Sequence, residues 1–183
     1  LHTSGRVTDK EPKGDQGGNL FQLTPEGTPR AQQLNLHWFW DSIVNRNVPL
    51  KAGMCECDYL ESAAKKMMKA NPFSLLQAGL KLGQYEEWQK ESFAYDNTVV
   101  FSPDLKRNQK PSKQYTKKAF KLAERQLAMA GYRLGETLNA IFRAAHSIKG
   151  GSGTFGFTQL TEATHEMETL FDALRKGEGA ADA

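Results

Sequence analysis

The chain has 183 residues, which is enough for one or two domains, and it carries a net charge of +3. Hydrophobic residues make up 39% and charged residues 25% of it, so a buried core is expected and wholesale disorder is excluded. The charge is too small to indicate nucleic acid binding by itself, and no apolar run approaches the ~20 residues that a membrane-spanning helix needs.

The predicted elements begin with a long loop over residues 3–28, which is rich in Gly, Asp, Lys, Thr and Pro. Long loops inside compact domains are often functional. Thr28-Pro29 then predicts a helix start, with Thr as N-cap, and the helix is expected over 29–45. Further helices are expected over 58–70, 72–82 and 85–97.

A helical pattern then runs from Ser112 to Ile148. Gly131 and Gly135 lie inside it and each costs about 1 kcal/mol relative to Ala, so they are expected to mark close packing. A last helix is expected from Thr158 to residue 177, and no segment alternates like a strand. The predicted fold is therefore all-α. The last helix carries an apolar stripe at helical spacing, made of Leu160, Ala163, Met167, Leu170, Phe171 and Leu174.

Two cysteines, Cys55 and Cys57, are separated by one residue. Cysteines this close rarely bond to each other, and two thiolates alone make an incomplete zinc site. They are predicted to be free thiols, with a bridge to another chain or to a distant partner as the alternative. The chain begins without a methionine or a signal peptide, so we expect a processed chain or a piece of a longer protein.

The stretch "LNLHWFWDSIV" places His37 and Asp41 four residues apart, on one face of a helix. An imidazole nitrogen and a carboxylate oxygen can converge there on a zinc ion, at about 2.0–2.2 Å. Such a metal lowers the pKa of bound water and offsets charge on a phosphate. The alternative is a hydrogen-bonded surface pair. The neighbouring Trp38, Phe39 and Trp40 are core residues or a base-stacking platform.

The segments "LHTSGRVTDKEPKGDQGGNLF", "NLHWFWDS", "WQKES" and "AERQLAMAGYRLGETLN" follow one another at suitable spacings. Together they resemble the C-terminal half of the zinc-dependent single-strand nucleases of the S1/P1 type, over residues 1–141. The resemblance implies a mostly helical fold that cleaves phosphodiester bonds in RNA and single-stranded DNA through a three-zinc cluster. It also implies removal of 3′-phosphates from nucleotides.

By this resemblance, His2, His37 and Asp41 bind one zinc of the cluster. The family's other zinc ligands would lie before Leu1, so the chain is expected to hold at most one zinc and to have little or no nuclease activity alone. The "GDQGGN" loop is expected beside the substrate, with a plain turn as the alternative. Its implied substrate-binding residues are Asp15, Gly17, Gly18 and Asn19.

A second pattern, "AAHSIKGGSGTFGF", puts His146 on a helix with Lys149 one turn later, followed by three glycines within four residues. Glycine is costly inside a helix, so these positions indicate a surface that another protein's backbone must approach. A neutral imidazole is a competent nucleophile toward phosphorus, and an ammonium group can balance the incoming charge. The alternative is a helix C-terminus stopped by the glycines.

His165 and Glu168 lie three residues apart on the last helix. If the last two helices pack antiparallel, Glu168 can accept a hydrogen bond from one nitrogen of His146 and fix its tautomer. "LNAIFRAAHSIKGGSGTFGF" followed by "LTEATHEMETLFDALRKGE" resembles the histidine phosphotransfer domain of chemotaxis sensor kinases, over residues 138–178. This resemblance implies that His146 accepts a phosphoryl group from a kinase domain, beside Lys149, His165 and Glu168. Response regulators then take that group onto an aspartate.

The family domain is a bundle of helices, and two helices alone cannot bury their apolar stripes. The long helix from Ser112 can substitute for one; otherwise exposed Leu160, Met167, Leu170 and Phe171 are expected to favour association. Residues 138–142, "LNAIF", fit both families, so we interpret the chain as two unrelated fragments joined there. The predicted domains are 1–139, nuclease-like, and 140–183, a partial phosphotransfer domain.

The predicted fold is therefore a helical phospholipase C/nuclease-like fragment that continues through a long helix into a partial bundle. The predicted function is a zinc-dependent phosphodiesterase fragment acting on single-stranded nucleic acid or nucleotides. The alternatives are a phosphotransfer module that meets a kinase domain and response regulators, and a fusion without function. Localisation stays unassigned, because the nuclease family is exported and chemotaxis kinases are cytoplasmic.

Overall fold

A computed structural model describes residues 7–9 and 11–176 of the chain. The chain divides into two compact units, Leu1–Ala128 and Met129–Ala183, and one long helix contributes residues to both. Within the described residues the regular structure is helical, with two isolated β-bridges and no strand longer than a bridge. The predicted all-α fold is confirmed. None of the described helices is both long and apolar enough to cross a membrane.

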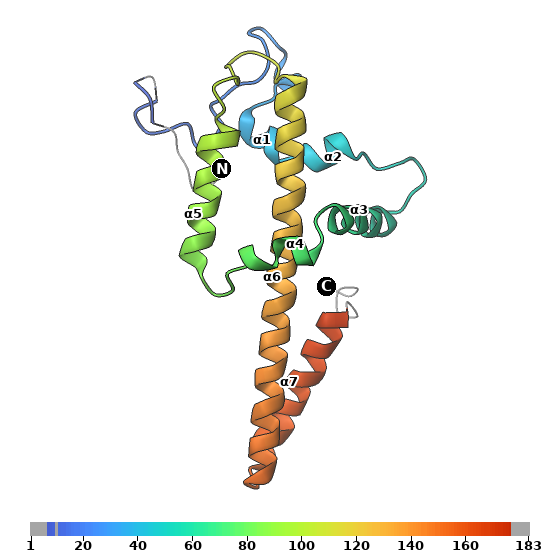
Figure 1. The fold of residues 1–183 in the computed structure, drawn as a ribbon. Helices are drawn as coiled ribbons and strands as arrows, with labels where there is room; N and C mark the ends of the chain where they lie inside the picture. Colours follow the sequence, from blue (N-terminus) through green and yellow to red (C-terminus); the bar gives the residue numbers. More distant parts are fainter. Residues whose placement is uncertain (1–6, 10, 177–183) are drawn as a thin grey trace. The chain divides into compact units, whose positions relative to one another are not determined.

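The long helices follow the predicted order (Figure 1). The predictions for 58–70 and for the last helix are confirmed to within two residues, whereas the helix expected over 72–82 ends after one turn. The one expected over 85–97 continues as a π-helical turn, Asp96–Val100. The α-helices are α1 (Leu36–Asp41), α2 (Ile43–Asn47), α3 (Glu56–Ala70), α4 (Phe73–Leu76), α5 (Tyr85–Tyr95), α6 (Lys113–Thr154) and α7 (Thr158–Lys176).

The helix predicted over 29–45 is wrong in its first half. Only a 3-10 turn forms, at Arg30–Gln32, and the chain is then extended until α1 begins. The N-cap is Asn35 rather than Thr28, and the Asn35 side chain accepts a hydrogen bond from the Trp38 backbone N–H at 2.7 Å.

Contacts between segments distant in sequence explain this late start. The Leu34 carbonyl accepts a hydrogen bond from the Leu23 N–H at 2.7 Å, and the Leu36 N–H donates to the Phe21 carbonyl at 2.9 Å. These backbone groups are therefore used by the preceding loop and are not available to an earlier helix. The same bonds hold the loop against α1.

The core of the first unit joins the loop, α1, the segment after α5 and the start of α6. Tyr115 on α6 ties these elements together, because its hydroxyl donates to the Val100 carbonyl at 2.8 Å and accepts from the Trp40 indole N–H at 3.2 Å. Within this unit α5 also contacts α6, through Arg125 and Glu91 (Figure 1). The buried cluster consists of Phe21, Leu23, Leu36, Phe39, Ile43, Val100, Phe101, Leu105, Tyr115 and Ala119.

The prediction that Cys55 and Cys57 are free thiols is wrong, because a disulfide joins them, with Cα atoms 5.5 Å apart. Cys55 is the N-cap of α3, and its Sγ accepts a hydrogen bond from the Asp58 N–H at 3.3 Å. The chain bends from an extended cap residue into the first helical turn. That bend brings the two Cα atoms into the range that a disulfide needs.

In the second unit, the latter part of α6 and α7 form an antiparallel hairpin (Figure 1). Helix α6 continues through Gly150, Gly151 and Gly153 to Thr154, six residues beyond the predicted end. The turn comes at Gly156, whose φ of 74° is left-handed. The alternative that the three glycines stop the helix is therefore wrong.

The helical glycines of α6 face open space, since a Cβ atom built on any of them would meet nothing within 4 Å. The expected close packing at Gly131 and Gly135 is therefore wrong. The helices of the hairpin meet through small and polar side chains: the hydroxyls of Ser152 and Thr161 lie 2.9 Å apart. Much of the apolar stripe stays uncovered, with Leu170 57% exposed, Leu160 and Met167 also exposed and Phe171 half-buried.

Candidate functional sites

His37 and Asp41 face each other one turn apart on α1. His37 Nε2 lies 3.3 Å from Asp41 Oδ2, and His37 Nδ1 lies 3.0 Å from the Gly17 carbonyl oxygen. A carbonyl only accepts hydrogen bonds, so Nδ1 carries the proton in the neutral ring and Nε2 offers a lone pair. Nε2 and the carboxylate are then two acceptors side by side, an arrangement that a proton or a metal cation between them stabilises.

This geometry fits one zinc ion, because both donors are of types that zinc accepts and the ring is oriented by a second group. Asp41 is exposed and His37 is half-buried, so the pair can be reached from solvent. The third predicted ligand, His2, lies outside the described residues. The metal role of all three residues stays a prediction.

The "GDQGGN" loop packs on the N-terminus of α1. Gly18 has a φ of 89°, and a Cβ there would lie 3.2 Å from both the His37 backbone nitrogen and Leu36 Cβ, so any other residue would be strained and crowded. Asp15 and Gly17 are buried, and Asn19 is half-buried. The structure therefore places these residues against the helix that carries His37. Their predicted contact with substrate is not tested.

The hydrogen bond from the His37 ring to the Gly17 carbonyl is a contact at this candidate site that the sequence did not predict. The two residues are 20 positions apart, and the contacting atom of Gly17 is a backbone oxygen. The only signal in the sequence was the glycine pair itself, which permits the close approach of the loop backbone.

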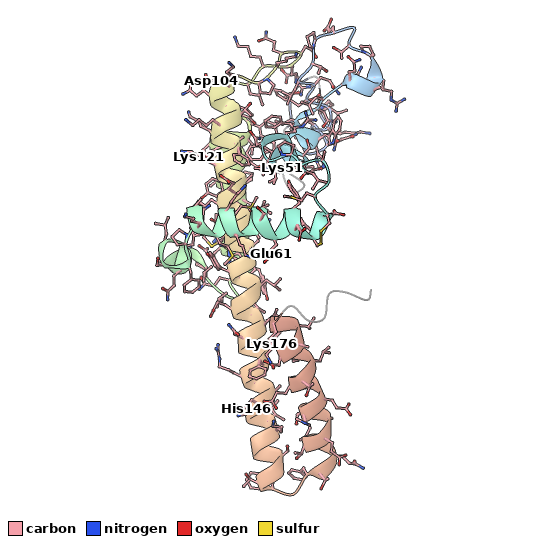
Figure 2. All side chains as sticks on the ribbon, turned by 90° about the vertical axis from the view of Figure 1, so that its right-hand side faces the viewer. Lys51, Glu61, Asp104, Lys121, His146 and Lys176 are labelled. Carbon is pink, nitrogen blue, oxygen red and sulfur yellow. A yellow bond between two sulfur atoms is a disulfide. The ribbon has the colours of Figure 1, made fainter. Side chains whose placement is uncertain are left out.

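In the second unit, His146 on α6 meets Glu168 on α7. His146 Nδ1 lies 2.6 Å from Glu168 Oε1, and the Lys149 ammonium donates to Glu168 Oε2. The hydrogen bond expected between the two helices is present. The His146 side chain is 64% exposed on the α6 arm of the hairpin (Figure 2), so its other nitrogen is open to approach. The Phe142 ring stacks against the imidazole, with centroids 6.4 Å apart.

The ionisation of Glu168 decides which ring nitrogen of His146 carries the proton. The hydrogen bond from Lys149, followed by that from His146, holds the pKa of the Glu168 carboxyl below its ordinary value. Glu168 is therefore an ionised acceptor at neutral pH, the Nδ1 proton points at it, and the Nε2 lone pair faces solvent. His165 is exposed one turn before Glu168, and the structure does not bring its ring into this hydrogen-bonded group.

Comparison with known proteins assigns the longer part of the chain. The S1/P1 nuclease model matches residues 1–143. The chain belongs to the S1/P1 nuclease family. The Hpt domain model matches residues 119–183, so this family member also carries a histidine phosphotransfer domain. The two matches overlap within α6, in a stretch that includes residues 138–142. The chain is a chimera of the two kinds of domain.

The curated relatives match the second part. The chemotaxis protein CheA of Salmonella typhimurium is 74% identical over 43 residues, which are 24% of this chain and 6% of that protein. CheA of Klebsiella aerogenes is 65% identical over 43 residues, 24% of this chain and 7% of that protein. CheA of Cereibacter sphaeroides is 55% identical over 47 residues, which are 26% of this chain and 7% of that protein. The chain thus spans less than a tenth of these relatives. No solved structure matches it.

Proposed function

We propose that the C-terminal part of the chain, predicted as 140–183, accepts a phosphoryl group on His146. The observation that carries this proposal is the hydrogen bond between His146 Nδ1 and the Glu168 carboxylate. It supports a single tautomer of the ring, in which the exposed Nε2 is the nucleophile. The identity to CheA proteins around this histidine supports the same role.

The step needs no base in this chain. The Nε2 lone pair attacks the γ-phosphorus of ATP held by a histidine kinase, an N–P bond forms, and the P–O bond to the ADP leaving group breaks. Nε2 carries no proton to lose, and the positive charge that develops on the ring is stabilised by Glu168. Lys149 offsets charge on the incoming phosphoryl oxygens, and the uncovered glycines beyond it leave room for the kinase. A response regulator aspartate then takes the phosphoryl group.

The test is incubation of the full chain with a chemotaxis kinase and γ-labelled ATP. We expect label on the wild type, none on His146→Gln, and a rate about 10–100-fold lower for Glu168→Gln, as for other groups that orient a ring nitrogen. Glu166→Gln is the matched control, because it removes the same charge from an exposed position two residues away. Label retained by His146→Gln, or equal rates for the two glutamate variants, would contradict the proposal.

We also propose that His37 and Asp41 hold one zinc ion in the nuclease part, 1–139. The observation that favours this is the short approach of their two acceptor atoms, with the ring oriented by Gly17. When bound, zinc polarises a phosphoryl oxygen and lowers the pKa of its water ligand. The substrates would be single-stranded nucleic acid or nucleotides. With one metal in place of the family's cluster, hydrolysis is expected to be weak or absent.

Calorimetric titration of the chain with its Cys55–Cys57 disulfide intact tests this site with zinc. The wild type should bind about one equivalent, and His37→Ala should lose it, whereas His165→Ala removes an exposed imidazole elsewhere and should bind as the wild type does. Equal zinc binding by wild type and His37→Ala would remove the site. Failure of both the zinc and the labelling tests, in a chain that does not unfold cooperatively, would leave the fusion without function as the conclusion.

A further inference from the structure

We infer that Cys55, Cys57 and Asp58 form a redox-gated site for a soft or borderline divalent cation at the start of α3. Each residue offers one ligand atom, two sulfurs and a carboxylate oxygen, and these atoms all lie within 4.8 Å of one another. All three residues are exposed. None of them belongs to the His37–Asp41 pair or to the His146 group.

The disulfide is the closed state of this site. Both sulfurs are bonded to each other, so neither is a thiolate, and the thiolate is the form that binds metal. A dithiol reductant opens the site: two electrons and two protons pass to the cysteine sulfurs, the S–S bond breaks, and the reductant becomes a disulfide. A divalent cation then displaces the two thiol protons and binds both sulfurs together with the Asp58 carboxylate.

The helix start orients one of the two sulfur ligands. Cys55 is the N-cap of a 15-residue helix, and its Sγ already accepts the Asp58 N–H at 3.3 Å.

The donor set selects the kind of cation. Thiolates favour zinc, cadmium and similar ions over magnesium and calcium, which prefer oxygen ligands. Three protein ligands in an exposed position leave a fourth place for water, the pattern of an exchangeable rather than a closed structural site. The ligands lie within four consecutive residues, so binding orders little additional chain.

The experiment titrates the full chain with Cd²⁺, before and after reduction by a phosphine that contains no thiol. The readout is the ultraviolet sulfur-to-cadmium charge-transfer band, which the His37–Asp41 pair cannot produce. The chain has two cysteines, so the band reports this site alone. We expect one equivalent of Cd²⁺ in the reduced chain and no band in the oxidised chain.

Four variants test which residues are ligands. Cys57→Ser should abolish the band. Asp58→Asn should weaken binding by at least the ~10–100-fold that loss of a supporting group costs. Glu61→Gln, one turn further along α3, is the matched charge control and should bind as the wild type does. Cys55→Ser is a second test of the sulfur ligands, and its serine preserves the N-cap of α3. Circular dichroism verifies that each variant keeps its helices.

Four outcomes would overturn the inference. The first is a band in the oxidised chain. The second is no saturable binding after reduction. The third is half an equivalent of Cd²⁺ per chain, which indicates a cation bridging two molecules. The fourth is equal affinity of Asp58→Asn and Glu61→Gln, which would exclude the carboxylate as a ligand.

Discussion

Tyr115→Phe tests whether the loop, α1 and α6 share one cooperative core. The Tyr115 hydroxyl donates to the Val100 carbonyl at 2.8 Å and accepts from the Trp40 indole N–H at 3.2 Å. Burial in this cluster also raises the pKa of Tyr115. Phenylalanine keeps the ring and its packing against Phe39, so no cavity forms.

The expected loss of unfolding free energy follows from the two polar groups that lose their hydrogen-bond partner, the Val100 carbonyl and the Trp40 indole N–H. A buried acceptor deprived of its donor costs about 1–3 kcal/mol, and Val100 is buried. Trp40 is half-buried and its N–H can reach water, so we expect a further ~0–1 kcal/mol from it. The total is about 1–4 kcal/mol of unfolding free energy. With a urea slope of ~2 kcal/mol/M, the unfolding midpoint should fall by about 0.5–2 M.

Tryptophan fluorescence is the appropriate assay, because Trp38, Trp40 and Trp88 are the three tryptophans of the chain and all lie in the first unit. Tyr85→Phe is the control: that side chain is 70% exposed, and its loss of a hydroxyl should change stability by no more than about 0.5 kcal/mol. Equal urea midpoints for Tyr115→Phe and Tyr85→Phe would refute the reasoning.

Three further predictions concern the loop, the hairpin and acid stability. Gly18→Ala should lower the urea midpoint by the equivalent of ~1–3 kcal/mol and weaken zinc binding, because its φ of 89° strains an alanine and its Cβ would crowd two atoms at 3.2 Å. Gly151→Ala should raise the free energy of unfolding of the hairpin by up to ~1 kcal/mol, seen as a higher thermal midpoint, because its Cβ meets open space. The same change should slow kinase labelling if the kinase needs that bare surface. Hydrogen bonds from Lys90 and Lys81 lower the pKa of Glu87 from 4.5 to about 2, so its stabilisation is complete above pH 4.5 and is lost as the pH falls toward 2; Glu87→Gln should flatten that loss in acid titrations.

Each of these three variants has a control variant with the same type of substitution at another position. Gly27→Ala has a similar φ of 82° with open space around it, so it separates steric contact from backbone strain. Gly135→Ala adds the same methyl group to α6 away from His146, and its labelling rate should equal that of the wild type. Glu86→Gln removes a neighbouring charge and should leave the acid profile unchanged. A Gly18→Ala chain as stable as Gly27→Ala, or matching acid profiles for the two glutamate variants, would contradict the argument.

Local signals predicted much of the fold. The helix predicted over 58–70 corresponds to α3 and ends where Asn71-Pro72 stops it. Helix α7 was predicted because its apolar residues repeat at helical spacing. The start of α1 could not be predicted from neighbouring residues. The hydrogen bonds that decide it run between backbone groups of the loop and of the segment Leu34–Leu36: the Leu23 N–H donates to the Leu34 carbonyl and the Leu36 N–H donates to the Phe21 carbonyl. These bonds depend on how the loop folds back.

In the candidate sites, too, contacts within a helix could be predicted from the sequence and contacts that depend on a loop could not. The contact between His37 and Asp41 follows from helical spacing, whereas the bond from His37 to Gly17 depends on a loop conformation that spacing does not encode. The contact between His146 and Glu168 needed one assumption, an antiparallel hairpin, which the structure supplies. The alternative in which the three glycines after Lys149 end the helix was wrong, because α6 stays helical through Thr154 despite the low helix propensity of glycine.

The bond between the His37 ring and the Gly17 carbonyl couples two events that are separate in sequence. A cation that binds Nε2 favours the ring orientation in which Nδ1 points at the loop, and it thereby strengthens the attachment of that loop to α1. Reciprocity requires that a more firmly attached loop bind the cation more tightly by the same factor. Zinc should therefore slow protease cleavage and amide hydrogen exchange around Gly17, which makes loop protection a measure of metal occupancy that needs no substrate.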